Sequence, residues 1–299
     1  MSIENIDSIL HEERLFQPSA EFVKSASINS LENLKDLHEQ ADQDYEGFWA
    51  KLGRDEISWQ TPFSNVLDDS KAPHYQWFND GKINVSYNCL DRHLESRGDN
   101  NAIIFEGEKG DIKTLTYREL HSQVGCFANA MKAQGIGKGD RVVIYMPMTP
   151  EAVVAMQACA RIGAIHSVVF GGFSAESLKD RIEDAGAKML ITADGGHRGG
   201  KIVELKQAAD KALTGGCPSI ETVIVYKRTG HNVSFNPDKD IWWHDAIQGM
   251  DSHCEPEWLE AEHPLFLLYT SGSTGKPKGI QHSSAGYLLG AILTMKWVF

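Results

Sequence analysis

The sequence lacks any apolar run long enough to span a bilayer. Its most apolar stretch, from Ala152 to Gly172, is interrupted by Arg161 and His166. The first residues, MSIENIDSILHEERLFQ, lack the basic start and apolar core of a signal peptide. Cysteine is scarce, with five residues and no CxxC spacing, as is typical of unpaired thiols in a reducing compartment. These absences predict a cytoplasmic protein without a membrane partner.

Positive charge is also scarce. The 299 residues include 29 Lys and Arg against 41 Asp and Glu, for a formal net charge of −12. A nucleic-acid partner requires a basic face that neutralises phosphates, so this balance argues against one. Metal-ligand spacing is missing as well, because His253, Cys254 and Glu255 adjoin without a recognised pattern. An acidic protein that binds a small polyanion must concentrate its few cations locally.

From about residue 101, short apolar segments alternate with amphipathic ones. Residues 102–117 predict two strands around a turn, and Thr116 and Glu119 form a capping box for a helix that ends near Gln134. Further strands are expected at 141–146, 164–170, 188–192, 222–226 and 264–270, and helices at 150–163, 174–186 and 201–213. Strands that are apolar throughout and alternate with helices predict an α/β fold, with a mostly parallel sheet flanked by helices.

Residues 1–90 have a different pattern. Ser30 can cap a helix that starts at Leu31, and isolated aromatic residues then alternate with turn formers such as Pro62 and Pro73. We expect an extended, aromatic-rich arm whose rings pack onto the large α/β domain of residues 91–299. At the start of that domain, Asp91 is expected to cap a helix.

The stretch YTSGSTGKPKG, residues 269–279, has the composition of a phosphate-binding loop. Ligands of α/β sheets bind beyond the carboxyl ends of strands, and the loop follows one, with a helix expected from about Ser283. Glycines permit a tight backbone whose N–H groups bind phosphate, hydroxyls add donors and lysines add positive charge. The candidate residues are Thr270, Ser271, Gly272, Ser273, Thr274, Gly275, Lys276, Lys278 and Gly279.

Two other interpretations of this loop fit less well. A flexible spacer would need neither lysine. A Walker loop, GxxxxGK[ST], would need glycine at Thr270 and a hydroxyl residue at Pro277.

The loop matches the phosphate-loop signature of the adenylate-forming superfamily, which contains acyl-CoA synthetases, luciferases and peptide-synthetase adenylation domains. In that superfamily the loop grips the β- and γ-phosphates of ATP while a carboxylate attacks the α-phosphate. The segments WFNDGKINVSYNCLDRHLESRGDNN and GDRVVIYMPMTPEAVVAMQACARIGAIHSVVFGGFSAESLKDRIEDAG resemble the acetyl-CoA synthetase family over nearly the whole chain. The resemblance implies an acetate–CoA ligase, although propionyl-CoA synthetases and other short-chain ligases share much of the pattern.

A second site is expected in ADGGHRGGKIVELK, residues 193–206. Arg198 and Lys201 flank Gly199 and Gly200 on a loop at the expected start of a helix, which is a natural position for an anion. The alternative is an exposed basic helix start, which would oppose the helix dipole. The resemblance implies that this segment contacts the 3′-phosphorylated nucleotide of coenzyme A. Lys201 stands where the compared family member has arginine, and lysine keeps the charge but loses the bidentate fork.

A neighbouring motif, Phe170-Gly171-Gly172, resembles a loop that lines the same nucleotide pocket. In the family, the residues that hold adenine, ribose, Mg²⁺ and the acyl group follow the phosphate loop, as does the small C-terminal domain with its catalytic lysine. We therefore expect the catalytic residues and the magnesium ligand beyond Phe299, in a missing C-terminal part. The isolated chain is expected to have little or no activity. The alternative from another class is a non-catalytic binding or interaction module.

Overall fold

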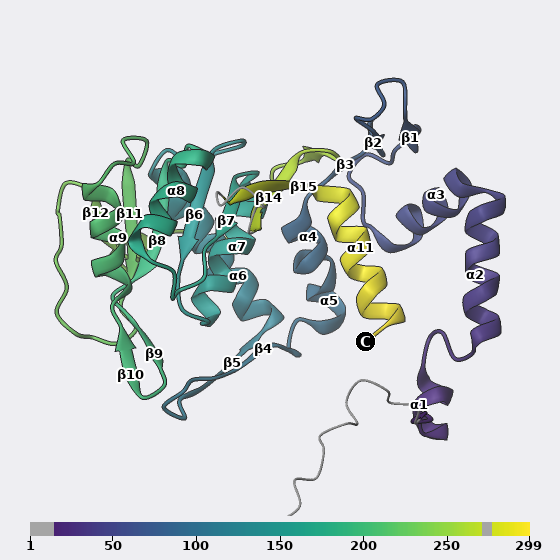
Figure 1. Cartoon of the computed structure of the whole chain (residues 1–299), viewed down its shortest axis with the longest axis horizontal. Coiled ribbons are helices and arrows are strands. Elements are labelled where there is room, and N and C mark those ends of the chain that lie inside the picture. Colours follow the sequence, from purple (N-terminus) through teal and green to yellow (C-terminus); the bar gives the residue numbers. More distant parts are fainter. Residues whose placement is uncertain (1–14, 271–276) are drawn as a thin grey trace, which may run out of the picture.

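A seven-stranded sheet forms the centre of the computed structural model, which describes residues 15–270 and 277–299 (Figure 1). The strand order is β12-β11-β8-β6-β7-β14-β15, and every neighbouring pair is parallel except β14 and β15. The strands are β6 (Arg141–Tyr145), β7 (Ile165–Val168), β8 (Met189–Ala193), β11 (Thr222–Tyr226), β12 (Asp240–Trp242), β14 (Pro264–Thr270) and β15 (Lys278–Ser283). The predicted fold class is confirmed.

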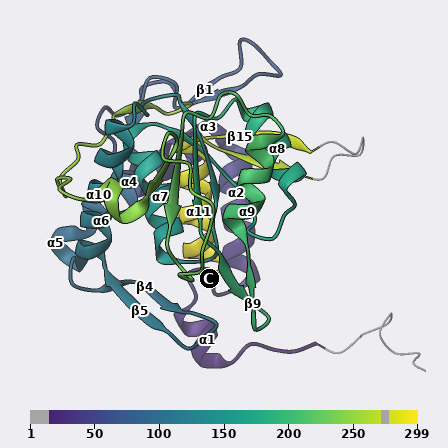
Figure 2. The same ribbon diagram turned by 90° about the vertical axis from the view of Figure 1, so that its left-hand side faces the viewer.

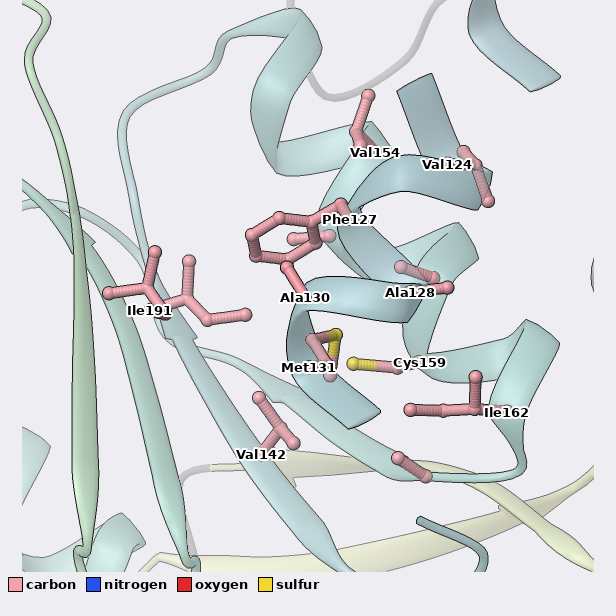
Figure 3. Packing of buried hydrophobic residues seen from close by; sticks show 14 of the residues in the cluster. Val124, Phe127, Ala128, Ala130, Met131, Val142, Val154, Cys159, Ile162 and Ile191 are labelled. Carbon is pink, nitrogen blue, oxygen red and sulfur yellow. The ribbon is translucent and has the colours of Figure 1, made fainter. Parts of the chain in front are cut away.

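Helices cover both faces of this sheet. The helices on one face are α6 (Tyr117–Ala133), α7 (Pro150–Ile162) and α10 (Trp243–Ile247), and those on the other are α8 (Ala175–Ala185) and α9 (Leu205–Thr214). Side chains of a strand point to alternate faces, so in β6 Val142 and Ile144 join one hydrophobic cluster while Val143 and Tyr145 join the other. Figure 3 shows the first cluster, in which Val142 and Ile191 meet the helix residues.

Two hairpins project from the sheet layer on the same side of the molecule in both views (Figures 1 and 2). One consists of β4 (Asn101–Glu106) and β5 (Ile112–Thr116), and the other of β9 (Gly196–Arg198) and β10 (Lys201–Val203). The capping box of Thr116 and Glu119 is confirmed at the start of α6.

The aromatic residues near the N-terminus pack against the end of the described chain. Phe63 and Phe78 have ring centroids 4.6 Å apart and share a buried cluster with Leu288 and Leu289 of α11 (Ser284–Trp297). The remaining elements are α1 (Ala20–Ser25), α2 (Leu31–Gln43), α3 (Tyr45–Glu56), β1 (Leu67–Asp68), β2 (Gln76–Trp77), β3 (Lys82–Ile83), α4 (Val85–Cys89), a 3₁₀ turn (Asp91–His93), α5 (Leu94–Arg97) and β13 (Leu259–Glu260).

The structure corrects several local predictions. Helix α9 begins at Leu205, because Lys201–Val203 pair with Gly196–Arg198 in a hairpin. Strand β15 separates the phosphate loop from α11, which itself begins one residue from the expected Ser283. Helix α3 carries Trp49, one of the aromatics expected in extended chain.

Asp91, which is partly buried, forms an ion pair with a buried arginine. The Asp91 side chain makes no capping hydrogen bond to the turn that it starts, contrary to the prediction. Arg161 of α7, whose side chain is 1% exposed, donates to both carboxylate oxygens at 2.8 and 2.9 Å. His121 of α6 approaches the same carboxylate at 3.1 Å, and Arg161 also donates to the carbonyl of Cys254. The carboxylate therefore joins three segments that are distant in sequence.

Replacing Asp91 should destabilise the fold strongly. In Asp91→Asn the guanidinium of Arg161 would stay buried without an anionic partner, which typically costs about 3–5 kcal/mol. We expect a loss of this size in the free energy of unfolding, measured by urea titration with tryptophan fluorescence. Asp99→Asn, at an exposed surface pair with Arg118, is the control and should change stability by less than about 1 kcal/mol.

The pH dependence provides an independent check. Burial alone would raise the pKa of Asp91, but hydrogen bonds from His121 and Arg161 and their charges hold it well below its usual range. A carboxyl with a lower pKa in the folded state stabilises the fold above its unfolded pKa of about 3.9, and this contribution is lost as the pH falls through the folded pKa. Below about pH 4 the wild type should therefore lose stability more steeply than Asp91→Asn. Parallel profiles would contradict this account.

Candidate functional site

A cavity of about 490 Å³ lies beyond the carboxyl ends of the central strands. Residues 146–149 after β6, 168–171 around the end of β7 and 196–198 of β9 line it. The β4–β5 hairpin closes one side with residues 105–108, and Leu268 near the end of β14 contributes to another. Ligands of open α/β sheets bind at this edge, because loops with free backbone groups converge there.

Three of the seven residues predicted to bind coenzyme A line this cavity, and Gly172, Gly199, Gly200 and Lys201 do not. The three are Phe170, Gly171 and Arg198. The guanidinium carbon of Arg198 lies 5.1 Å from the centre of the Phe170 ring, which is a cation–π distance. A Cβ atom on Gly172 would lie 2.8 Å from Nη1 of Arg198, so a larger residue would have to displace the guanidinium group from this position.

Arg198 and Lys201 lie at the tip of the β9–β10 hairpin. The prediction that they lie at the N-terminus of a helix is wrong. Gly199 and Gly200 form the two-residue turn between β9 and β10, with φ of +59° and +72°. A tight two-residue hairpin turn requires positive φ at both positions, and glycine adopts positive φ without strain. Arg198 and Lys201 are direct cross-strand partners, so their side chains leave the same face of the hairpin.

Four residues near the cavity were missed by sequence reasoning. Glu108 accepts hydrogen bonds from the backbone of the Gly199–Gly200 turn, and Arg228 forms an ion pair with Asp111 at 2.7 Å. Thr149 lines the cavity, and its buried hydroxyl has no hydrogen-bond partner among residues 15–270 and 277–299. None of these three belongs to a motif. The fourth, Asp194, lies two residues after the strand predicted at 188–192, and this position was the available signal.

Asp194 fixes the loops next to the β9–β10 hairpin, which carries Arg198 and Lys201 and is called the basic hairpin below. Its side chain is fully buried and accepts backbone N–H groups of Gly195, Arg228, Thr229 and Gly230 at distances between 2.7 and 3.2 Å. A buried carboxylate that accepts several amide donors is well solvated by the protein itself. The carboxylate therefore holds the end of β8 and the segment after β11 in one arrangement.

The phosphate loop connects two antiparallel strands. Ser271–Lys276, six of the predicted phosphate-binding residues, lie outside the described residues. Of the other three, Thr270 pairs with Lys278 across β14 and β15, and Gly279 pairs with Tyr269. Leu268, two residues before Thr270, lines the cavity, so the base of the loop lies at the same sheet edge as the basic hairpin.

Tyr269 anchors the base of this loop to α8. Its hydroxyl donates to Asp184 at 2.6 Å, and the guanidinium carbon of Arg181 lies 5.5 Å from its ring centre. Burial, together with the charge of Asp184, raises the pKa of Tyr269 far above its usual value. The phenol therefore stays protonated and remains the donor.

Neither a metal-binding cluster nor a membrane-spanning helix is found among the described residues. No three His, Cys, Asp or Glu side chains gather there closely enough to hold a metal ion. Within the same residues, no helix has the length and apolar character needed to cross a bilayer.

Two family models match the sequence. Residues 34–89 match the acetyl-coenzyme A synthetase N-terminus, and residues 90–298 match the AMP-binding enzymes. The chain belongs to the AMP-binding enzyme family. The resemblance carried by the phosphate loop is thereby confirmed.

Curated relatives and a solved structure agree with this assignment. Acetyl-coenzyme A synthetases of Methylobacillus flagellatus and Thiobacillus denitrificans are 62% and 60% identical over 296 and 295 residues. These matches cover 99% and 98% of the chain but 45% of each relative, so the chain spans less than half their length. Acetoacetyl-CoA synthetase from Streptomyces lividans superimposes with a TM-score of 0.83 at 28% identity, covering 93% of this chain and 44% of that one.

Replacing Asp194 should loosen this edge of the AMP-binding fold. Asp194→Asn removes the charge and turns one acceptor into a donor that faces backbone N–H groups, so we expect a loss of about 2 kcal/mol or more in unfolding free energy. Amides of Arg228, Thr229 and Gly230 should exchange faster with deuterium. Asp238→Asn, at an exposed position, is the control. Unchanged exchange at 228–230 would show that Asp194 does not hold this segment.

Proposed function

We propose that this chain supplies the phosphate-binding and coenzyme A-binding elements of an AMP-forming acetate–CoA ligase. The complete protein would convert acetate, ATP and coenzyme A to acetyl-CoA, AMP and pyrophosphate through enzyme-bound acetyl-adenylate. The observation that carries the proposal is the placement of the phosphate-loop strands and the basic hairpin at one sheet edge around one cavity. Identity of 62% and 60% to two acetyl-CoA synthetases favours acetate over propionate.

The first step is attack of an acetate oxygen on the α-phosphorus of ATP. The bond from that phosphorus to the bridging oxygen breaks, and pyrophosphate leaves with the electron pair. Negative charge therefore grows on the leaving group, where positioned donors and cations lower the barrier most. Lys276 and Lys278 would supply this charge, and the hydroxyls from Thr270 to Thr274 would supply donors. Mg²⁺ would enter as MgATP, and we assign it no ligand among the described residues.

In the second step the thiol of coenzyme A loses its proton and its sulfur forms a bond with the acyl carbon, while the bond from that carbon to the AMP oxygen breaks and AMP leaves with the electron pair. The chain's contribution is to hold the nucleotide end of coenzyme A. Arg198 and Lys201 leave the same face of the hairpin and would bind the 3′-phosphate together. Phe170, Gly171 and Gly172, beside Arg198, would line the nucleotide pocket. Guanidinium groups bind phosphate through charge-assisted hydrogen bonds, which are stronger than neutral ones.

Other features of the complete protein are also proposals. A cytoplasmic location fits the free state of all five cysteines. Residues 1–90 would serve as an arm on the α/β domain of residues 91–299, and a further C-terminal portion would complete the acyl and adenine sites. A non-catalytic binding module is the competing function, and the exchange experiment below distinguishes the two.

Acetate-dependent exchange of labelled pyrophosphate into ATP tests the first step. Residues 1–299 followed by the remaining sequence of the Methylobacillus flagellatus relative should catalyse exchange, whereas residues 1–299 alone should not. Lys278→Ala in the longer protein should lower the exchange rate about 100-fold, since it removes charge at the leaving group. Lys211→Ala, an exposed lysine of α9, is the matched control. An inactive longer protein that folds, or full activity in Lys278→Ala, would refute the assignment.

Binding of adenosine 3′,5′-bisphosphate tests the coenzyme A site separately. Calorimetry with the 299-residue chain should show that Arg198→Ala weakens this ligand about 10-fold or more, the effect of one charge-assisted contact. Lys201→Ala should have a smaller effect, because lysine makes no bidentate contact. AMP lacks the 3′-phosphate, so its affinity should not change in either variant. Equal losses for both ligands would contradict a 3′-phosphate site at the hairpin tip.

A further inference from the structure

The Gly199–Gly200 turn of the basic hairpin is hydrogen-bonded to a carboxylate of the same chain. Glu108, in the turn between β4 and β5, reaches across to the β9–β10 hairpin. One carboxylate oxygen accepts the N–H of Gly199 at 3.1 Å, and the other accepts the N–H of Gly200 at 2.6 Å. The contact joins residues 91 and 92 positions apart in the sequence, and both sides of it are exposed.

Glu108 is presented from a well-anchored hairpin. Asp111, three residues later, forms an ion pair with Arg228 at 2.7 Å, and Lys113 of β5 pairs with Glu151 of α7 at 2.9 Å. Gly107 lies so close to Asp111 that a Cβ atom would come within 2.1 Å of its carboxylate. Two ion pairs on the β5 side of Glu108 therefore hold this hairpin to the rest of the domain.

The β9–β10 turn has the properties of an anion site. Successive backbone N–H groups in a turn form a concave donor pair that binds negatively charged oxygens. Here the pair is flanked by Arg198 and Lys201, which leave the same face of the hairpin. A carboxylate with one negative charge occupies the donors, although the two cations beside them would stabilise a doubly charged group better.

We propose that Glu108 is a specificity-determining residue that competes for the hairpin turn and is displaced by the 3′-phosphate of a coenzyme A nucleotide. This inference rests on the proposed coenzyme A site and adds a selection step to it. A phosphate dianion can replace the carboxylate because it offers more charge and more acceptor oxygens to the same amides and cations. A nucleotide without the 3′-phosphate gains nothing from displacing Glu108 and leaves it in place.

The displacement lowers the affinity for the 3′-phosphorylated ligand by the strength of the Glu108 contact. Removing the charge should therefore tighten binding of that ligand alone. Glu108→Gln keeps the size and an acceptor oxygen, so it isolates the effect of charge. For one exposed charged contact we expect about three- to fivefold tighter binding of adenosine 3′,5′-bisphosphate.

The experiment is calorimetry on the 299-residue chain with adenosine 3′,5′-bisphosphate and with AMP. Glu106→Gln is the matched control, because Glu106 lines the same cavity two residues earlier and has no hydrogen bond to Gly199 or Gly200 among those described. We expect less than about a twofold effect from Glu106→Gln, by screening of exposed charges. With ¹⁵N-glycine labelling, the Gly199 and Gly200 amide signals should move in Glu108→Gln and, on adding the bisphosphate, in the wild type.

The outcomes separate this inference from the proposed function. Unchanged or weaker bisphosphate binding in Glu108→Gln, with normal binding by the wild type, would refute the competition and leave the coenzyme A site intact. If Glu108→Gln also tightened AMP binding equally, or if Glu106→Gln had an equal effect, the change would be explained by the loss of one negative charge near the cavity. Either result would also refute the competition. Absence of bisphosphate binding in both the wild type and Glu108→Gln would refute the coenzyme A site together with this inference.

Discussion

Burial of the central strands on both faces is the constraint on which the rest of this structure depends. β6 and β8 place alternate side chains in two separate hydrophobic clusters, so neither strand can shift by one residue without exchanging the two sets. Fixed register also fixes where each strand ends. The segments after β6, β7 and β8 consequently meet at one edge, where the cavity lies. Beyond the strands, Asp194 accepts hydrogen bonds from backbone amides of the segments after β8 and after β11 and so fixes both segments.

The basic side chains fall into two groups, those buried in ion pairs and those exposed beside the cavity. Lys206, with a side chain 1% exposed, pairs with Asp240 at 2.8 Å and also with Asp210, and Arg161 pairs with Asp91. These buried cations are neutralised locally and stabilise packing. Arg198 and Lys201, in contrast, are exposed at a hairpin tip beside the cavity. In a protein with a net charge of −12, such an exposed pair is a local attractive region for an anionic ligand.

Local sequence patterns were sufficient for most of the sheet and for the β4–β5 hairpin, and insufficient for the β9–β10 hairpin. Strands such as 222–226 are short apolar runs, and the Thr116 capping box is a contact between near neighbours, so both are visible in sequence. Residues 201–203 continue a helical pattern, and only their pairing with residues 196–198 makes them a strand. Glu108 had no signal at all, because its partners lie more than 90 positions away. The phosphate-binding role of residues 269–279 stays a prediction from their motif, and Ser271–Lys276 lie outside the described residues.

The long stretch of sequence between β7 and β14 has a consequence for biosynthesis. β14 joins β7 across a separation of about 100 residues, as the bond between His263 and the carbonyl of Gly163 illustrates. Such distant pairing is slow, because a long loop must close before any contact rewards it. Five strands of the central sheet, β6, β7, β8, β11 and β12, all precede residue 243, so they can assemble while the ribosome is still synthesising the following residues. This order of synthesis allows β14 and β15 to join β7 after the other strands have paired.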